Sequence, residues 1–242
     1  MKKLLIIILI LILPIIVYAA DLFSDDFEDG TTDAWSSVTD ADSDMTVAEA
    51  AALHGTYGLN FLIDDQHNMW CQDDTPNAET RYRCRFYFDP NSLSMSNNNE
   101  FYLTLGFGSG SCFNLKFIYL DAVGGYRLVS TIYPDTGWTD SNYDISDGLH
   151  CIETDWKASS APGANDGFFR TWVDGELVGD TQDVDNDTKD LGSVRFGVHS
   201  TISAGLSGTV YLDDFASNIT GDEIGAFPAN LYSNILFIFS DF

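Results

Sequence analysis

Two predicted strands over residues 148–178 constrain the fold more than any other part of this sequence. A Gly/Pro/Asn-rich turn separates them, and the second strand runs into Asp174-Gly175. Asp-Gly supplies the positive φ angles that a two-residue hairpin turn needs, and it is one of the stronger short-range hairpin signals. This region therefore predicts consecutive antiparallel strands.

The rest of the chain repeats this pattern of short apolar runs separated by turn residues. Hydrophobic residues make up 45% of the chain and aromatic residues 14%, which is enough to build a core. Arg81, Arg83 and Arg85 alternate with aromatic residues and a cysteine, the period of a half-buried strand. Residues 45–52 could form a short helix or a strand. Further strands are expected near 22–30, 59–63, 67–72, 79–88, 100–107, 112–120, 125–132, 191–199 and 207–217. The prediction is an all-β, two-sheet antiparallel β-sandwich.

The first residues have the features of a secretion signal. Lys2 and Lys3 precede an apolar run from Leu4 to Val17, and a small-residue cleavage site follows. We expect a signal peptide over 1–19, with an uncleaved membrane anchor as the alternative, and a secreted or cell-surface protein with no membrane span after cleavage. A single domain is expected over 20–226. The apolar tail 227–242 could add a strand, pair with another subunit, or mark the edge of a longer reading frame.

The chain is strongly acidic. It has 11 basic and 37 acidic residues, and loss of Lys2 and Lys3 with the signal peptide changes the net charge from −26 to −28. Such a surface repels nucleic acids and anionic membranes. It also disfavours tight binding of sulfated or uronic-acid polymers unless a local basic cluster or a metal ion intervenes. Either solubility or binding of extracellular Ca²⁺ would explain the acidic residues.

Four cysteines fall in the predicted secreted part, where disulfides are favoured over zinc sites. Cys71 and Cys84 flank a turn near Pro76-Asn77, so they would face each other if this segment is a hairpin. Cys112 and Cys151 would then form the second pair. Three connectivities are open, and this is the one we predict.

Several segments resemble laminin-G-like, concanavalin-A-like jelly rolls of secreted bacterial proteins. Trp172-Val173-Asp174-Gly175 is similar to their W-x-D-G hairpin, and residues 23–30 are similar to their first strand. Residues 79–90 and 208–215 resemble a central and the final strand. The resemblance implies a jelly roll over 20–226. It leaves function open, because this architecture hosts lectins, adhesins, lyases and glycosidases.

The resemblance also implies a structural calcium site where the first and last strands meet. The corresponding ligands would be Asp25 or Asp26, Glu28, and Asp213 or Asp214, with backbone oxygens near Gly30. Two alternating acidic runs, at 183–187 and 40–44, are weaker candidates. They lack the glycine and terminal glutamate of a calcium loop, and a solvated turn explains them as well.

No complete catalytic motif is present. Glu153-Thr154-Asp155 begins like the strand motif of laminarinase-type glycosidases, but Lys157 occupies the position of the acid/base. An ion-pair row along one sheet face is the favoured interpretation. A polysaccharide lyase would need a base and a cation. The four histidines, His54, His67, His150 and His199, are better explained as surface or edge residues.

Exposed aromatic residues are the best candidates for a binding site, because sugar rings stack on them. Trp156 and Trp172 fall within strands and are expected in the core. The predicted ligand-binding residues are Trp35, Trp70, Trp138, Tyr143 and Arg83. We therefore expect a non-catalytic module that binds carbohydrate or a surface polymer, with calcium as the candidate cofactor. The alternatives are a self-assembling structural subunit and, third, a lyase or glycoside hydrolase.

Overall fold

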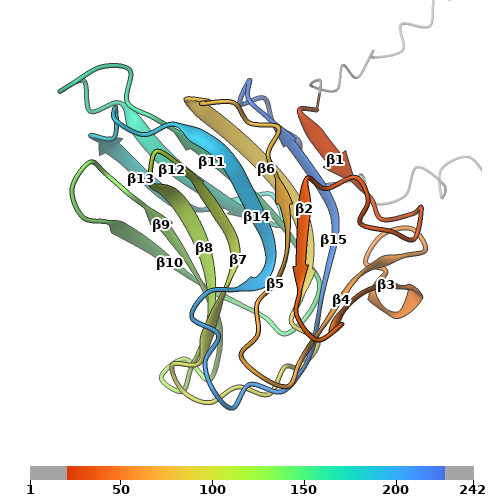
Figure 1. Cartoon of the computed structure of the whole chain (residues 1–242). Helices are drawn as coiled ribbons and strands as arrows, with labels where there is room; N and C mark the ends of the chain where they lie inside the picture. The colour runs from red at the N-terminus through yellow and green to blue at the C-terminus, as the bar shows by residue number, and fades with distance from the viewer. Residues whose placement is uncertain (1–20, 227–242) are drawn as a thin grey trace, which may run out of the picture.

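The structure is a computed structural model and describes residues 21–226 (Figure 1). The predicted signal peptide (1–19) and apolar tail (227–242) lie outside the described residues, so secretion and tail-mediated assembly remain predictions. Within 21–226 the chain forms strands and one short 3₁₀ helix, η1 (Glu49–Ala51). In this part of the chain, no helix has the length and apolar character that crossing a membrane requires.

The strands form two antiparallel sheets, which confirms the predicted two-sheet β-sandwich. In the eight-stranded sheet the order is β13-β12-β11-β6-β15-β4-β3, with β1 paired to β15. In the seven-stranded sheet it is β10-β9-β8-β7-β14-β5-β2. The eight-stranded sheet contains β1 (Phe23–Asp25), β3 (Met45–Ala48), β4 (Gly58–Ile63), β6 (Arg81–Asp89), β11 (His150–Lys157), β12 (Gly167–Val173), β13 (Glu176–Val184) and β15 (Gly208–Asn218). The seven-stranded sheet contains β2 (Ser37–Asp40), β5 (Met69–Asp73), β7 (Glu100–Gly108), β8 (Ser111–Leu120), β9 (Gly125–Ile132), β10 (Thr139–Ile145) and β14 (Leu191–His199).

The hairpin predicted from Asp174-Gly175 is present. Val173 pairs with Glu176 across the β12–β13 turn. Asp174 and Gly175 have φ angles of 53° and 82°. These positive values are those that Asp-Gly was expected to supply. The strands β11 and β12 also pair antiparallel, as the sequence predicts.

The core lies between the two sheets and is rich in aromatic residues. Trp156 is fully buried there, as predicted. Trp35 was predicted to lie in an exposed loop, and this was wrong, because only 6% of it is exposed. Its ring stacks on Phe27 and Phe196, at centroid distances of 6.4 and 5.7 Å. The Trp35 indole also donates a hydrogen bond to the Asp25 carboxylate at 2.7 Å, which holds it in this buried position.

The predicted disulfides are absent, since all four cysteines are buried and free. Cys71 is on β5 in the seven-stranded sheet, whereas Cys84 is on β6 in the eight-stranded sheet. The turn between them therefore crosses from one sheet to the other instead of closing a hairpin. Cys112 on β8 and Cys151 on β11 also belong to different sheets. Burial raises the pKa of the Cys84 and Cys112 thiols to about 12.

Two strands differ from expectation. The strands β2 and β10 form at Ser37–Asp40 and Thr139–Ile145, where the sequence analysis predicts no strand. Both are edge strands of the seven-stranded sheet, where pairing on one side suffices. Residues 45–52 adopt both of the predicted alternatives, with β3 followed directly by η1.

Candidate functional site

The outer face of the eight-stranded sheet is closed by ion pairs. Strands β6 and β11 place Arg83 opposite Asp155 and Arg85 opposite Glu153. The guanidinium of Arg81 bonds Asp155 at 2.8 Å, and that of Arg83 bonds the Glu153 carboxylate. Lys157 pairs with Asp166 at 2.8 Å. The ion-pair row favoured from the sequence is confirmed.

Residues 221–225 lie across this ion-pair row. The Glu153 carboxylate accepts hydrogen bonds from the backbone N–H groups of Ile224 and Gly225, at 2.9 and 3.0 Å. The Gly221 carbonyl accepts from Arg81 and Arg83, at 3.4 and 3.2 Å. Both oxygens of Glu153 are used in these contacts, so this carboxylate holds residues 221–225 against the sheet. The contacts do not support its use as one of a pair of glycosidase carboxylates. Arg83, predicted to bind a ligand, is only 7% exposed and is committed to these contacts.

The outer face of the seven-stranded sheet is different, because it carries an open groove of about 410 Å³. Polar and aromatic side chains from β7, β8, β9, β10 and the β9–β10 loop converge here. The lining residues are Tyr102, Asn114, Lys116, Thr131, Tyr133, Trp138 and Asp140. The register explains the convergence: Tyr102 pairs with Lys116, and Asn114 pairs with Thr131, which pairs with Asp140. Cross-strand partners share a face, so one side of four adjacent strands contributes to the groove.

A hydrogen-bonded chain lies at the floor of the groove. The Asn114 amide donates to the Tyr133 hydroxyl at 2.9 Å. Burial raises the pKa of Tyr102, and a hydrogen bond with Tyr133 works in the opposite direction. Asn114 is 1% exposed, yet its Oδ1 has no hydrogen-bond partner among the described residues. Buried acceptors are nearly always paired, so this oxygen is available to a ligand donor.

His199 is a second buried polar group on this face. It was expected from the sequence to be a surface or edge residue, and this was wrong, because only 1% of it is exposed. It pairs with Tyr102 across β14 and β7, and its ring meets the tyrosine ring edge-on with centroids 6.0 Å apart. Burial, followed by the charge of Arg195, lowers the pKa of His199 to about 3. The imidazole is therefore neutral, and its Nε2 has no hydrogen-bond partner in the described part of the chain.

Two predicted aromatic residues flank this face and one does not. Trp138 is 69% exposed at the groove. Trp70 on β5 stacks under the Arg195 guanidinium, 4.3 Å from its ring centroid. Tyr143 packs against the core from β10. Trp172 was expected in the core but is only partly buried, and it stacks with Arg83 at 4.5 Å.

Sequence reasoning missed several groove residues, among them Tyr102, Asn114, Lys116 and Tyr133. A signal for them exists in the alternation of β7 and β8. Phe101 and Phe117 point into the core, so their neighbours Tyr102 and Lys116 must point outward. The Lys116 ammonium pairs with Glu100 at 3.0 Å.

The five predicted calcium ligands contact different partners, which include both backbone N–H groups and side chains. Asp25 accepts from the Phe27 N–H and from the Trp35 indole, and Glu28 accepts from two backbone N–H groups. Asp214 pairs with Arg85 at 3.2 Å. Asp213 is fully buried, and burial raises its pKa to about 7. Asp26 lies with Asp25 and Asp214 along a separate hollow of about 350 Å³.

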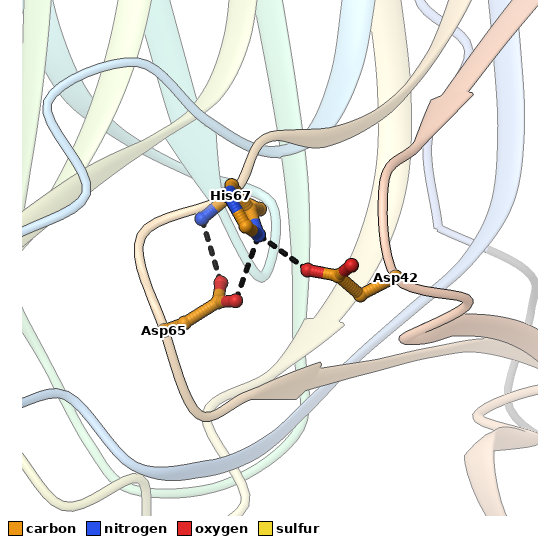
Figure 2. A group of neighbouring side chains, drawn as sticks. All are labelled: Asp42, Asp65 and His67. Atoms are coloured by element: carbon orange, nitrogen blue, oxygen red, sulfur yellow. Dashed lines mark hydrogen bonds and ion pairs between the residues drawn. The ribbon is translucent and has the colours of Figure 1, made fainter.

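Three other acidic groups in the described residues bring potential metal ligands within 4.8 Å of one another. One consists of Asp42, Asp65 and His67, on exposed loops (Figure 2). The His67 Nδ1 contacts both carboxylates, and its pKa is raised mainly by the hydrogen bond with Asp42. This arrangement is an exposed ion-pair cluster. The other two groups are Asp44, Asp64 and Asp65, and Asp135, Asp185 and Asp187.

The remaining histidines also have carboxylate partners. His54 lies 3.4 Å from Asp214, and His150 lies 2.8 Å from Asp174 at the hairpin turn. His54 lies in the bend before β4, and His150 is the first residue of β11. Neither lies in the groove, so His199 is the histidine that the fold places beside it.

No protein-family profile and no curated protein sequence matches this chain. Solved structures do share its fold. A variant of the alginate lyase Aly36B in complex with an alginate trisaccharide has a TM-score of 0.59 at 14% identity, covering 81% of this chain and 97% of that chain. Aly36B itself has a TM-score of 0.56 at 16% identity, covering 77% and 88%. The binding domain of botulinum neurotoxin DC in complex with rat synaptotagmin II has a TM-score of 0.51 at 11% identity, covering 72% and 41%.

These similarities correct one expectation and support another. The prediction that the chain has no catalytic activity is contradicted, since the similar folds include an enzyme at 14–17% identity. At such identity the likeness shows the fold alone. The predicted β-sandwich is confirmed, while membership of the concanavalin-A-like family remains a proposal. The chain is an all-β sandwich. Ion pairs and residues 221–225 cover the outer face of one sheet, and the outer face of the other sheet carries the groove.

Proposed function

We propose that this protein binds a saccharide in the groove on the outer face of its seven-stranded sheet. The buried, unpartnered Oδ1 of Asn114 at the groove floor carries the proposal. It provides an acceptor for a sugar hydroxyl, while the exposed Trp138 provides an apolar surface for the ring. Variants of Aly36B, which share the fold, were solved in complex with alginate oligosaccharides, and this supports a carbohydrate ligand.

Binding of an oligosaccharide panel, measured by affinity electrophoresis and calorimetry, tests this proposal. Trp138→Ala should weaken binding about fivefold, since an aromatic contact contributes roughly 1 kcal/mol. The matched control is Leu177→Ala, which removes another exposed apolar side chain, 46% exposed on β13 of the other sheet. Equal losses in both variants, or no binding by the wild type, would refute the proposed groove.

A second candidate function is cleavage of the bound saccharide by β-elimination. The observation that favours it is the presence of two tyrosine hydroxyls and an amine in one groove, from Tyr102, Tyr133 and Lys116. Such groups can remove the proton on the carbon beside the carboxylate and donate a proton to the glycosidic oxygen as its bond to the neighbouring carbon breaks. Burial raises the pKa of both tyrosines, so each is protonated before a ligand arrives and is suited to act as the acid.

The lyase candidate is tested by the ultraviolet absorbance of the unsaturated sugar end that β-elimination creates. Tyr133→Phe should abolish the absorbance change while leaving binding within a few fold, because the aromatic ring remains. Uronate polymers incubated with wild-type protein and showing no new absorbance would exclude this candidate.

We also propose a structural calcium ion at Asp213 on β15, beside the bend that precedes β4. One Asp213 oxygen accepts from the N–H groups of Leu53 and His54, at 2.8 and 2.9 Å. The other is buried without a hydrogen-bond partner among the described residues, and a cation would satisfy it. If the proposal is correct, EDTA will lower the melting temperature of the wild type but not of Asp213→Asn. An unchanged wild-type melting temperature would contradict it.

A further inference from the structure

Arg195 differs from every other arginine in this chain. Six arginines lie within residues 21–226, and five have a carboxylate within 4.0 Å. Arg195 has none among the described residues. In a chain with 37 acidic and 11 basic residues, an arginine without an acidic partner is unexpected. The surrounding fold must therefore hold this guanidinium by other means.

Three neighbours fix the Arg195 guanidinium in place. It lies between two aromatic rings, with its Cζ 4.3 Å from the centroid of Trp70 and 5.0 Å from that of Phe107. Its Nε donates to the Gln72 side-chain oxygen at 3.0 Å. The Gln72 amide in turn donates to Asp74 at 2.7 Å, which fixes the direction of the Gln72 oxygen.

This arrangement leaves the two terminal nitrogens of Arg195 without a hydrogen-bond partner in the described part of the chain. A guanidinium has five N–H donors, and only the Nε–H is used here. The terminal pair forms a planar fork that matches the two oxygens of a carboxylate. Because the rings and Gln72 already restrict the side chain, little rotamer entropy remains to be lost on binding.

Arg195 shares its sheet face with the groove. Its neighbours Val194 and Phe196 are fully buried, so alternation directs Arg195 outward. It is in register with Leu105, which is in register with Asn114 at the groove floor. Two strand spacings separate Arg195 from Asn114, roughly 10 Å. An oligosaccharide lying across the strands can therefore contact both residues.

We infer that Arg195 is a recognition site for the carboxylate of an acidic sugar, so that the groove takes uronate-containing saccharides. This inference rests on the proposed function and adds the substrate class to it. The preformed guanidinium is the local cationic group that a chain of this net charge needs in order to accept an anionic polymer. The bound carboxylate would accept two parallel hydrogen bonds from the terminal nitrogens.

The experiment measures binding of alginate and polygalacturonate tetrasaccharides, and of the same oligosaccharides after reduction of their carboxyl groups to hydroxymethyl groups. Arg195→Gln should weaken uronate binding at least tenfold and leave binding of the reduced sugars unchanged. Arg195→Lys, which keeps the charge without the planar fork, should give an intermediate loss. Arg170→Gln is the matched control, because this substitution removes the same charge on the other sheet. Like Arg195, Arg170 stacks on an aromatic ring, with its Cζ 4.4 Å from the Phe168 centroid. Melting temperatures establish that each variant is folded.

The outcomes separate the two proposals. Binding of reduced and uronate sugars with equal affinity, or equal losses in Arg195→Gln and Arg170→Gln, overturns the inference while leaving the groove intact. Binding of neither class by the wild type overturns both proposals. Uronate binding that falls in Arg195→Gln alone, and that weakens with added salt, supports the inference.

Discussion

Glu153 gives the sharpest test of whether the closed sheet face is structural. Its carboxylate is paired with Arg83 and accepts two backbone hydrogen bonds from Ile224 and Gly225. Only 7% of its side chain and 9% of that of Arg83 are exposed. Glu153→Gln keeps the shape of the side chain and one acceptor oxygen, but it removes the charge that compensates the buried guanidinium.

The expected loss follows from the contacts that remain. Removing one partner of a buried ion pair costs about 3–5 kcal/mol. Arg83 keeps Asp155 at 3.7 Å and the Gly221 carbonyl at 3.2 Å, so we expect the lower end of that range. A loss of about 3 kcal/mol corresponds to a fall of roughly 6–12 °C in melting temperature for a domain of this size. Residues 221–225 should also lose protection from hydrogen exchange.

Calorimetry and urea unfolding measure this loss, with Asp180→Asn as the matched control. Asp180 pairs with Arg170 at 3.0 Å on the same sheet, but its side chain is 30% exposed. Pairs of this kind contribute less than about 1 kcal/mol. A Glu153→Gln variant as stable as Asp180→Asn would refute the anchoring role. If that stable variant also lost a saccharide-cleaving activity, Glu153 would have to be a catalytic residue.

Three further predictions follow from buried groups and from one close backbone approach. His199 has a pKa of about 3 in the folded chain against 6.5 in the unfolded chain, so the unfolded chain binds the extra proton and stability falls as the pH drops below about 6. Compared with the wild type, His199→Gln should lose less unfolding free energy on acidification, by about 1.4 kcal/mol per pH unit; equal slopes would contradict the burial argument. Gly221 has a φ of 77°, and a Cβ there would lie 1.8 Å from the Arg81 Cζ, so Gly221→Ala should lower the melting temperature more than Gly163→Ala, where φ is 72° and the space is open. All four cysteines should resist a thiol reagent in the folded protein and react after unfolding; fewer than four reactive thiols would mean that a disulfide forms.

The strands and the principal hairpin could be predicted because their signals are local. Alternation in β6 shows which residues face the core, and Asp174-Gly175 fixes a turn by its backbone preference alone. The Cys71–Cys84 pairing failed for the converse reason. A turn that joins two strands of one sheet and a turn that crosses to the other sheet have the same composition, and only the strand order distinguishes them.

The binding face depends on the strand order as well. Both sheets carry polar side chains at outward positions, so alternation alone gives two candidate faces. The register between β6 and β11 neutralises one face, because it sets arginines opposite acids, and residues 221–225 then cover the ion pairs. On the other sheet, Arg195 is instead opposite Gln72 and Leu105, neither of which carries a charge. The charge of Arg195 is thus left uncompensated by the same pairing rules that compensate Arg83. That difference between the two faces of the sandwich is the reason for proposing that an anionic ligand binds on the seven-stranded sheet.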